Sequence, residues 1–75
     1  MKINYKKLGK RIQSARRDTG LSQEQLAEAI GKSPSAVSTI ETGKRGASLE
    51  TLVHIANVLQ VSADYLLADQ LPHIP

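Results

Sequence analysis

Few side chains in this sequence are suited to covalent or metal chemistry. The 75 residues contain no cysteine, and His54 and His73 are the only histidines. Neither histidine has a second ligand at the spacing that a metal site needs, and no serine is paired with a base and an orienting group. A glycine-rich loop of the kind that cradles phosphate is also missing. We therefore expect no enzymatic activity, no metal and no cofactor.

Hydroxyl side chains instead gather on one side of a short segment in the middle of the chain. Val37 and Ile40 have the spacing of the inward side of a helix. The outward side then carries Ser35, Ser38 and Thr39. Their hydroxyls can donate or accept hydrogen bonds, and a threonine methyl can contact the methyl of thymine. Hydroxyls in this arrangement are compatible with contacts to DNA bases, and also with a helix that they merely keep soluble.

Charge is distributed unevenly along the chain, whose net charge is +3. Residues 1–20 contain seven Lys or Arg and one Asp, whereas residues 21–75 contain three Lys or Arg and six Asp or Glu. A protein with this distribution can present a basic face to phosphate and an acidic face away from it. The alternative is an ordinary protein with a solvated, lysine-rich helix.

Capping signals divide the chain into five short helices. Asn4, Ser22, Ser33, Ser48 and Ser62 stand where helix caps are expected, and Gln25 completes a capping box with Ser22. The expected helices cover about residues 5–19, 23–30, 34–42, 49–59 and 63–68. We expect an all-α, compact five-helix bundle with one domain over residues 1–68 and a tail over residues 69–75. With no apolar run long enough to span a bilayer and no signal peptide, the expected location is cytoplasmic.

Helical periodicity predicts the inward faces of two of these helices. The first helix has an apolar stripe formed by Tyr5, Leu8, Ile12, Ala15 and Thr19. The fourth has an inner face formed by Leu49, Leu52, Val53, Ala56 and Leu59.

Two charged residues also fall on apolar stripes. Arg16 follows Ile12 by four residues, and Glu41 follows Val37 by four. Because a buried charge needs a partner, we infer that Arg16 and Glu41 form an ion pair that joins the first and third helices. The alternative is two exposed charges whose stems pack along the surface.

The segment from Leu21 to Gly43 resembles the helix-turn-helix of the phage-repressor and Cro family, also called Xre-like regulators. The matching residues are Gln23, Leu26–Ala27, Ile30–Gly31, Ser33, Val37–Ser38, Ile40–Glu41 and Gly43. The pattern continues through Leu52, Ala56, Leu59, Val61–Ser62 and Asp64–Leu67 and covers about residues 8–68. The resemblance implies a lambda-repressor-like DNA-binding domain and the same Arg16–Glu41 pair. Gln60 departs from the family's usual glycine, so it must adopt a left-handed conformation if the turn is kept.

The resemblance also assigns DNA contacts. It implies base readout by Pro34, Ser35, Ser38 and Thr39, and phosphate contacts by Gln23, Lys32, Ser33, Thr42, Lys44 and Arg45. Pro34 stands where many relatives have glutamine or arginine, and none of the four readout residues offers a bidentate hydrogen-bonding group. We therefore expect modest direct readout and a larger contribution from phosphate contacts and DNA shape.

The expected function is sequence-specific binding of double-stranded DNA by a transcriptional regulator of the repressor type. Such modules bind as pairs on adjacent half-sites, so we expect a homodimer at least on DNA. The expected dimer interface consists of Tyr65, Leu66, Leu67, Leu71 and Ile74. Some of these residues must instead pack on the fourth helix, and the tail could equally be disordered. An alternative function is an antitoxin-type module that neutralises a small protein partner and regulates its own operon.

Overall fold

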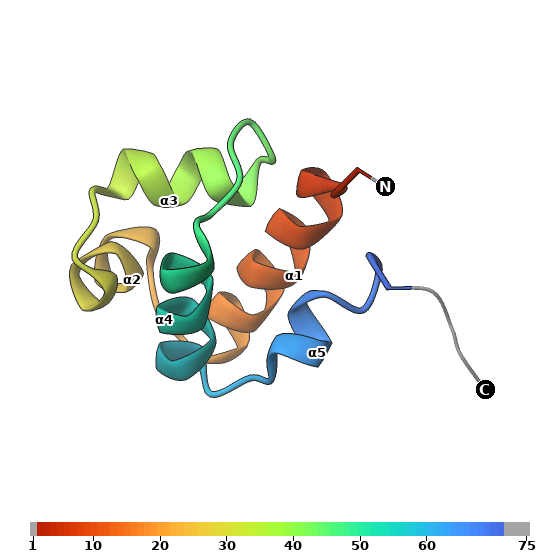
Figure 1. The fold of residues 1–75 in the computed structure, drawn as a ribbon. Coiled ribbons are helices and arrows are strands. Elements are labelled where there is room, and N and C mark those ends of the chain that lie inside the picture. The colour runs from red at the N-terminus through yellow and green to blue at the C-terminus, as the bar shows by residue number, and fades with distance from the viewer. Residues whose placement is uncertain (1, 72–75) are drawn as a thin grey trace.

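The computed structural model describes residues 2–71 and consists of five α-helices, with no strand in this range (Figure 1). The helices are α1 (Tyr5–Asp18), α2 (Gln23–Ile30), α3 (Pro34–Glu41), α4 (Leu49–Leu59) and α5 (Ala63–Leu66). The fold class predicted from the sequence is therefore confirmed. Within the described range, no helix has both the length and the apolar character required to cross a membrane.

Side-chain caps start all five helices at the expected positions. The Asn4 side chain accepts a hydrogen bond from the backbone of Lys7, and Ser22, Ser33, Ser48 and Ser62 each accept one from the residue three positions later. Gln25 closes the capping box by accepting the backbone N–H of Ser22. These contacts satisfy amide groups that a helix leaves unpaired at its start, which is why short helices form here.

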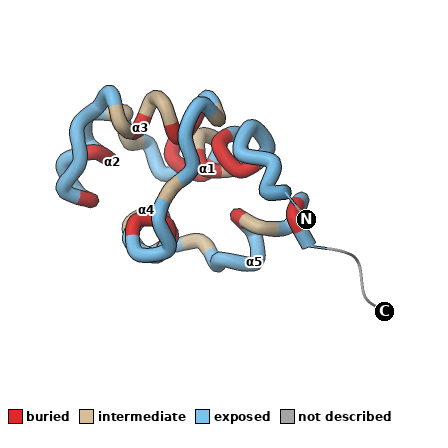
Figure 2. The backbone as a smooth tube through the Cα atoms, turned by 45° about the horizontal axis from the view of Figure 1, so that its top comes forward, coloured by how far each residue is buried: buried red, intermediate tan, exposed pale blue. Residues whose placement is uncertain are grey.

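The core lies where the helices meet, and Figure 2 shows buried segments on each helix with mostly exposed connections between them. Its largest fully buried side chains are Ile12, Leu26, Val37, Ile55 and Leu66. The predicted stripe of α1 is wrong at both ends. Tyr5, the first residue of the helix, is 43% exposed, and Thr19, which caps its end, is also exposed.

The predicted inner face of α4 is also partly wrong. Leu52, Ala56 and Leu59 are buried, but Leu49 is 78% exposed and Val53 is 48% exposed. Thr51 and Ile55 are buried in their place. Apolar residues occupy more than one side of this helix, so two overlapping sets have helical spacing, and packing against α1, α2 and α5 selects one of them. The other set, which includes Leu49 and Val53, forms an exposed apolar face of α4.

The turn after α4 keeps its left-handed geometry without glycine. Gln60 has φ 56° and ψ 42°, and its N–H and that of Val61 bond to carbonyls in the last turn of α4. Gln60 is the only residue other than glycine with positive φ in the described range. The conformation inferred from the missing glycine is therefore present, at a cost of about 1–2 kcal/mol.

The segment after α5 is attached to the first helix. Gln70 is buried, accepts the Asn4 N–H at 2.7 Å and donates to the Asn4 carbonyl at 2.8 Å. Beside it, Asp69 forms an ion pair with Arg11 at 2.5 Å. Because these contacts join residues 69 and 70 to the start of the chain, we propose a domain that extends to at least Gln70 instead of ending at residue 68.

Candidate nucleic-acid interface

The outward side of α3, formed by Pro34, Ser35, Ser38 and Thr39, is named here the reading face. Pro34 and Ser35 are exposed, and Ser38 and Thr39 are half-buried. The opposite side of α3 is buried in the core through Val37 and Ile40. The helix lies along one edge of the molecule, with its outer side free of other elements (Figure 1). All four residues assigned to base readout therefore share one accessible surface.

Thr39 has a restricted hydroxyl. Its Oγ1 donates to the carbonyl of Ala36 at 2.9 Å. The proton of this hydroxyl is thus used inside the helix, which leaves its lone pairs and the methyl group for a ligand. Thr39 can accept a hydrogen bond from a base or contact a thymine methyl, but its hydroxyl is less available as a donor.

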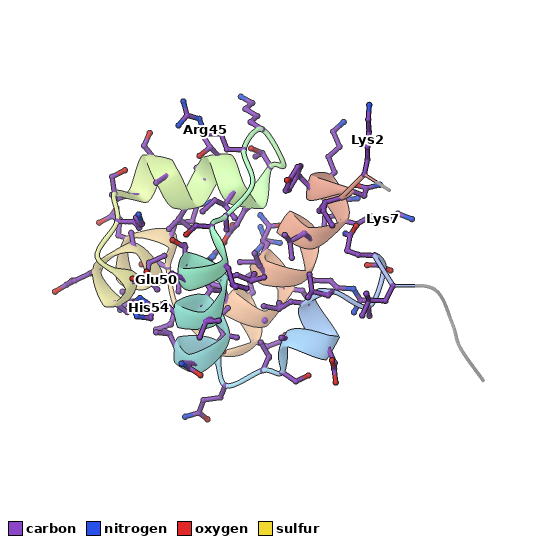
Figure 3. All side chains as sticks on the ribbon, viewed as in Figure 1. Lys2, Lys7, Arg45, Glu50 and His54 are labelled. Atoms are coloured by element: carbon purple, nitrogen blue, oxygen red, sulfur yellow. The ribbon has the colours of Figure 1, made fainter. Side chains whose placement is uncertain are left out.

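A tight turn at the end of α3 positions the basic residues that follow it. Gly43 has φ 77°, its N–H bonds to the carbonyl of Ile40, and the Lys44 N–H bonds to the carbonyl of Thr39. This pair of bonds is a Schellman motif, which needs a left-handed residue at the glycine position. Lys44 and Arg45 are exposed directly beyond it, and Arg45 points away from the bundle on the same side as α3 (Figure 3).

The reading face borders an open cleft of 510 Å³ between α3 and the segment that leads to α4. Lys32, Ser35, Thr39 and Arg45 are among the residues that line it. Residues assigned to bases and residues assigned to phosphate therefore meet at a single concave surface. Its two cations and several hydroxyls match the chemistry of an anionic ligand, because a phosphate oxygen accepts hydrogen bonds from both.

One buried carboxylate fixes the position of α3. Arg16 donates to both oxygens of Glu41, through Nε at 2.6 Å and Nη2 at 3.0 Å, and its Nη1 donates to the carbonyl of Leu21 at 2.8 Å. The Glu41 side chain is fully buried, and that of Arg16 is 9% exposed. The hydrogen bonds to Glu41 raise the pKa of the Arg16 guanidinium above its ordinary value, against the effect of burial. The structure thus brings together the two charges that the sequence paired.

The Gln23 side chain joins the same network. Its Nε2 donates to Oε1 of Glu41 at 3.0 Å. Sequence reasoning assigned Gln23 to phosphate but not to this contact, because residue spacing within α2 gives no information about the end of α3. In this arrangement the first residue of α2 is tied directly to the last residue of α3.

The other residues assigned to phosphate lie at the two ends of α3. Lys32 and Ser33 are exposed before it, and Ser33 accepts the Ala36 N–H as the helix cap. Thr42 is exposed after it and donates to the Ser38 carbonyl at 2.9 Å. The hydroxyls of Ser33 and Thr42 thus already take part in local hydrogen bonds. Lys32, Lys44 and Arg45 are the cations of the set, and all three are exposed.

Two glycines determine how α1 meets the end of α3, and of these the sequence analysis named Gly43 but not Gly9. A Cβ on Gly9 would overlap the carbonyl oxygens of Glu41 and Ile40, so only glycine allows this approach. A Cβ on Gly43 would lie 2.7 Å from Cα of Lys6. The sequence contained one signal for Gly9, because it stands inside a helical pattern. A glycine there destabilises the helix by about 1 kcal/mol relative to alanine, which suggests that packing requires it.

The dimer interface expected from the sequence needs correction. Leu66 is completely buried in the monomer, so it cannot contribute to a surface between two copies. Leu67 is half-buried, whereas Tyr65 and Leu71 are 36% and 54% exposed. The Arg11 guanidinium lies over the Tyr65 ring, 5.0 Å from its centre. One face of the ring is therefore already in contact within the monomer. Ile74 lies outside the described residues.

Comparison with known proteins gives consistent matches. A family model described as helix-turn-helix, HTH_3, matches residues 12–66. The SPbeta prophage-derived uncharacterized HTH-type transcriptional regulator YonR of Bacillus subtilis is 36% identical over 59 residues, which is 79% of this chain and 55% of YonR. The chain spans about half the length of the first curated relatives that it matches.

Solved structures show the same arrangement. The restriction-modification controller protein C.AhdI from Aeromonas hydrophila superposes with a TM-score of 0.78 at 35% identity, covering 83% of this chain and 94% of C.AhdI. The master regulator for biofilm formation SinR, solved in complex with DNA, gives a TM-score of 0.75 at 36% identity, covering 80% of this chain and 97% of that structure.

Proposed function

This chain belongs to the helix-turn-helix family HTH_3, and from that premise we propose that it is a transcriptional repressor that binds a specific double-stranded DNA sequence. The reading face enters the major groove, and Lys32, Lys44 and Arg45 contact the flanking phosphates. Such a protein acts in the cytoplasm, where its DNA target is, and needs no catalytic activity.

The observation that carries the proposal is the cleft beside α3. Hydroxyls of the reading face and the side chains of Lys32 and Arg45 line the same 510 Å³ hollow. The buried Arg16–Glu41 pair holds the helix that forms one wall of it. A rigid helix with hydroxyls outward and cations at its ends is suited to a groove between two phosphate backbones.

Selection of bound sequences from a random pool of duplexes by the purified chain tests the proposal. We expect an enriched sequence with two related half-sites about one helical turn, roughly 34 Å, apart. Bound DNA with no enriched sequence, or no bound DNA, would refute sequence-specific recognition.

We further propose that two copies bind together through the uncovered face of α4. The exposed side chains of Leu49 and Val53 border an apolar groove of 310 Å³ that Leu52, Ala56 and Leu67 also line. Protruding apolar groups and a hollow on one surface suit a symmetric pair, in which each copy fills the groove of the other. This location replaces the interface that the sequence analysis placed around α5 and the tail.

The oligomeric state of two variants distinguishes the interfaces. We expect Val53→Asp to shift the chain to a monomer in analytical ultracentrifugation and to weaken DNA binding, whereas Leu71→Asp leaves both unchanged. The reverse pattern would support the interface around the tail.

The antitoxin alternative receives no support from the relatives named above, which are a transcriptional regulator, a controller protein and a master regulator.

A further inference from the structure

The first turn of α1 is packed against the basic segment that follows α3. Gly43 lies so close to Lys6 that an added Cβ would be 2.7 Å from its Cα and 2.8 Å from its Cγ. Two residues beyond Lys44, Gly46 lies against the ring of Tyr5, which an added Cβ would overlap. The Gly43 contact needs a glycine, because a Cβ there would overlap backbone atoms of Lys6, and Gly46 adjoins the Tyr5 ring. The start of α1 and residues 43–46 therefore form one continuous surface.

Four cations occupy this surface, and we name them the cationic ridge: Lys2, Lys6, Lys44 and Arg45. All four are exposed. The two stretches that contribute them, residues 2–10 and 42–49, contain no Asp or Glu. Within residues 2–71 the ion pairs are Arg11–Asp69 and Arg16–Glu41, so none of the ridge cations is neutralised by a neighbour there.

The ridge faces the same side of the molecule as α3. Figure 3 shows Lys2 and Arg45 pointing outward on the side where α3 lies, whereas Lys7 points away in another direction. The stem of Lys6 crosses Gly43, at the end of α3. Lys44 and Arg45 directly follow the end of α3, and Lys6 and Lys2 extend the same positively charged surface beyond them.

We infer that Lys6 and Lys2 bind backbone phosphates of the DNA next to the half-site that α3 reads. This inference rests on the proposed function and adds residues to it. Neighbouring lysines on α1 have a different part: Lys7 lies close enough to Asp69 to help lower the pKa of that carboxylate, so it belongs to the face that holds the segment after α5. Lys6 and Lys7 are adjacent and carry the same charge, but we assign DNA binding to Lys6 and contact with the segment after α5 to Lys7.

The salt dependence of DNA affinity tests this assignment. The measurement is fluorescence anisotropy at a series of NaCl concentrations, using a duplex that extends several base pairs beyond the selected sequence. The variants are Lys6→Gln and its matched control Lys7→Gln, with Lys44→Gln as a comparison. Glutamine keeps the Cβ and Cγ that lie over Gly43 and replaces the charged end of the side chain with a neutral amide.

We expect Lys6→Gln to lower the slope of log affinity against log salt by up to about 0.9, as loss of one phosphate contact does, and Lys7→Gln to leave it unchanged. The change should be the same on selected and random duplexes, since phosphates carry no sequence information. On a duplex trimmed to the selected sequence, Lys6→Gln should bind like the unmodified chain.

Equal slopes for Lys6→Gln and Lys7→Gln on the long duplex would overturn the inference while leaving the proposed function intact. An unmodified chain without salt-dependent DNA binding would overturn the proposed function and the inference with it. Circular dichroism of each variant separates a lost contact from a lost fold.

Discussion

The carboxamide nitrogen of Gln23 lies 3.0 Å from Oε1 of Glu41, the oxygen that also accepts Nη2 of Arg16. The buried carboxylate of Glu41, at the end of α3, therefore accepts hydrogen bonds from Arg16 of α1 and from Gln23, the first residue of α2. Three helices meet at this one side chain. The junction thus ties the end of α3 to both helices that pack against it.

Replacing Gln23 by alanine removes one of these hydrogen bonds. We expect a loss of stability of about 1.5–3 kcal/mol, typical of a hydrogen bond to a charged group, measured by urea unfolding. Affinity should fall equally on selected and random duplexes with an unchanged salt slope, because no charge is lost. Gln13→Ala on α1 is the control, and equal DNA affinity of the two variants would show that the junction does not support binding.

Removing Arg16 leaves the Glu41 carboxylate buried without its main partner. We expect Arg16→Met to destabilise the fold by about 3–5 kcal/mol, since an unpaired buried charge costs more than the intact pair contributes. Arg17→Met, at an exposed position, should change stability by no more than about 0.5 kcal/mol. Chemical denaturation gives both values, and similar values for the two would mean that the pair is not needed for the fold.

On the reading face, Thr39 has a side chain whose possible contacts with DNA are restricted by a hydrogen bond inside the helix. With its hydroxyl proton bonded to Ala36, Thr39 offers a methyl group and a hydrogen-bond acceptor. We expect Thr39→Ala to change the preferred base at one position of each half-site, and Thr39→Val to keep any preference for thymine there. Repeating the selection with both variants measures this. An equal loss of affinity for specific and random DNA would show that Thr39 does not read sequence.

The ion pair between Arg11 and Asp69 predicts a pH dependence. The hydrogen bond from Arg11 lowers the pKa of Asp69 below its ordinary value of 3.8, and the charges of Arg11 and Lys7 act in the same direction. Because the folded state has the lower pKa, the pair stabilises the fold above the unfolded value and loses this contribution as pH falls through the folded one. A double-mutant cycle with Arg11→Met and Asp69→Asn should show coupling at about pH 7 that declines below about pH 4. Coupling that persists in acid would contradict the assignment.

Local signals in the sequence were sufficient for much of the fold. Each cap is a contact between residues three apart, so Ser22 and Gln25 could be identified without tertiary information. The pairing of Arg16 with Glu41 could be inferred because each stands one turn after a buried aliphatic residue, and a buried charge needs a partner. The left-handed conformation of Gln60 followed instead from the family resemblance, because Gln60 stands where many relatives have glycine.

Features that depend on the packing of distant elements could not be predicted in this way. The apolar residues of α4 have two sets with helical spacing, and only the positions of α1, α2 and α5 decide that Ile55 is buried and Val53 is not. The sequence placed Leu66 among the candidates for the dimer interface without deciding which of them pack inside, and α5 directs it into the core. The contact of Tyr5 with Gly46 joins segments 41 positions apart and leaves no periodic signal in either.

The most direct test of the central claim is an NMR titration of the labelled chain with the duplex obtained by selection. If the reading face enters the groove, the largest amide shifts will occur over residues 35–39 and 42–46, with smaller changes at Lys2 and Lys6. Shifts concentrated on α4 and α5, with the amides of α3 unchanged at saturation, would contradict the account.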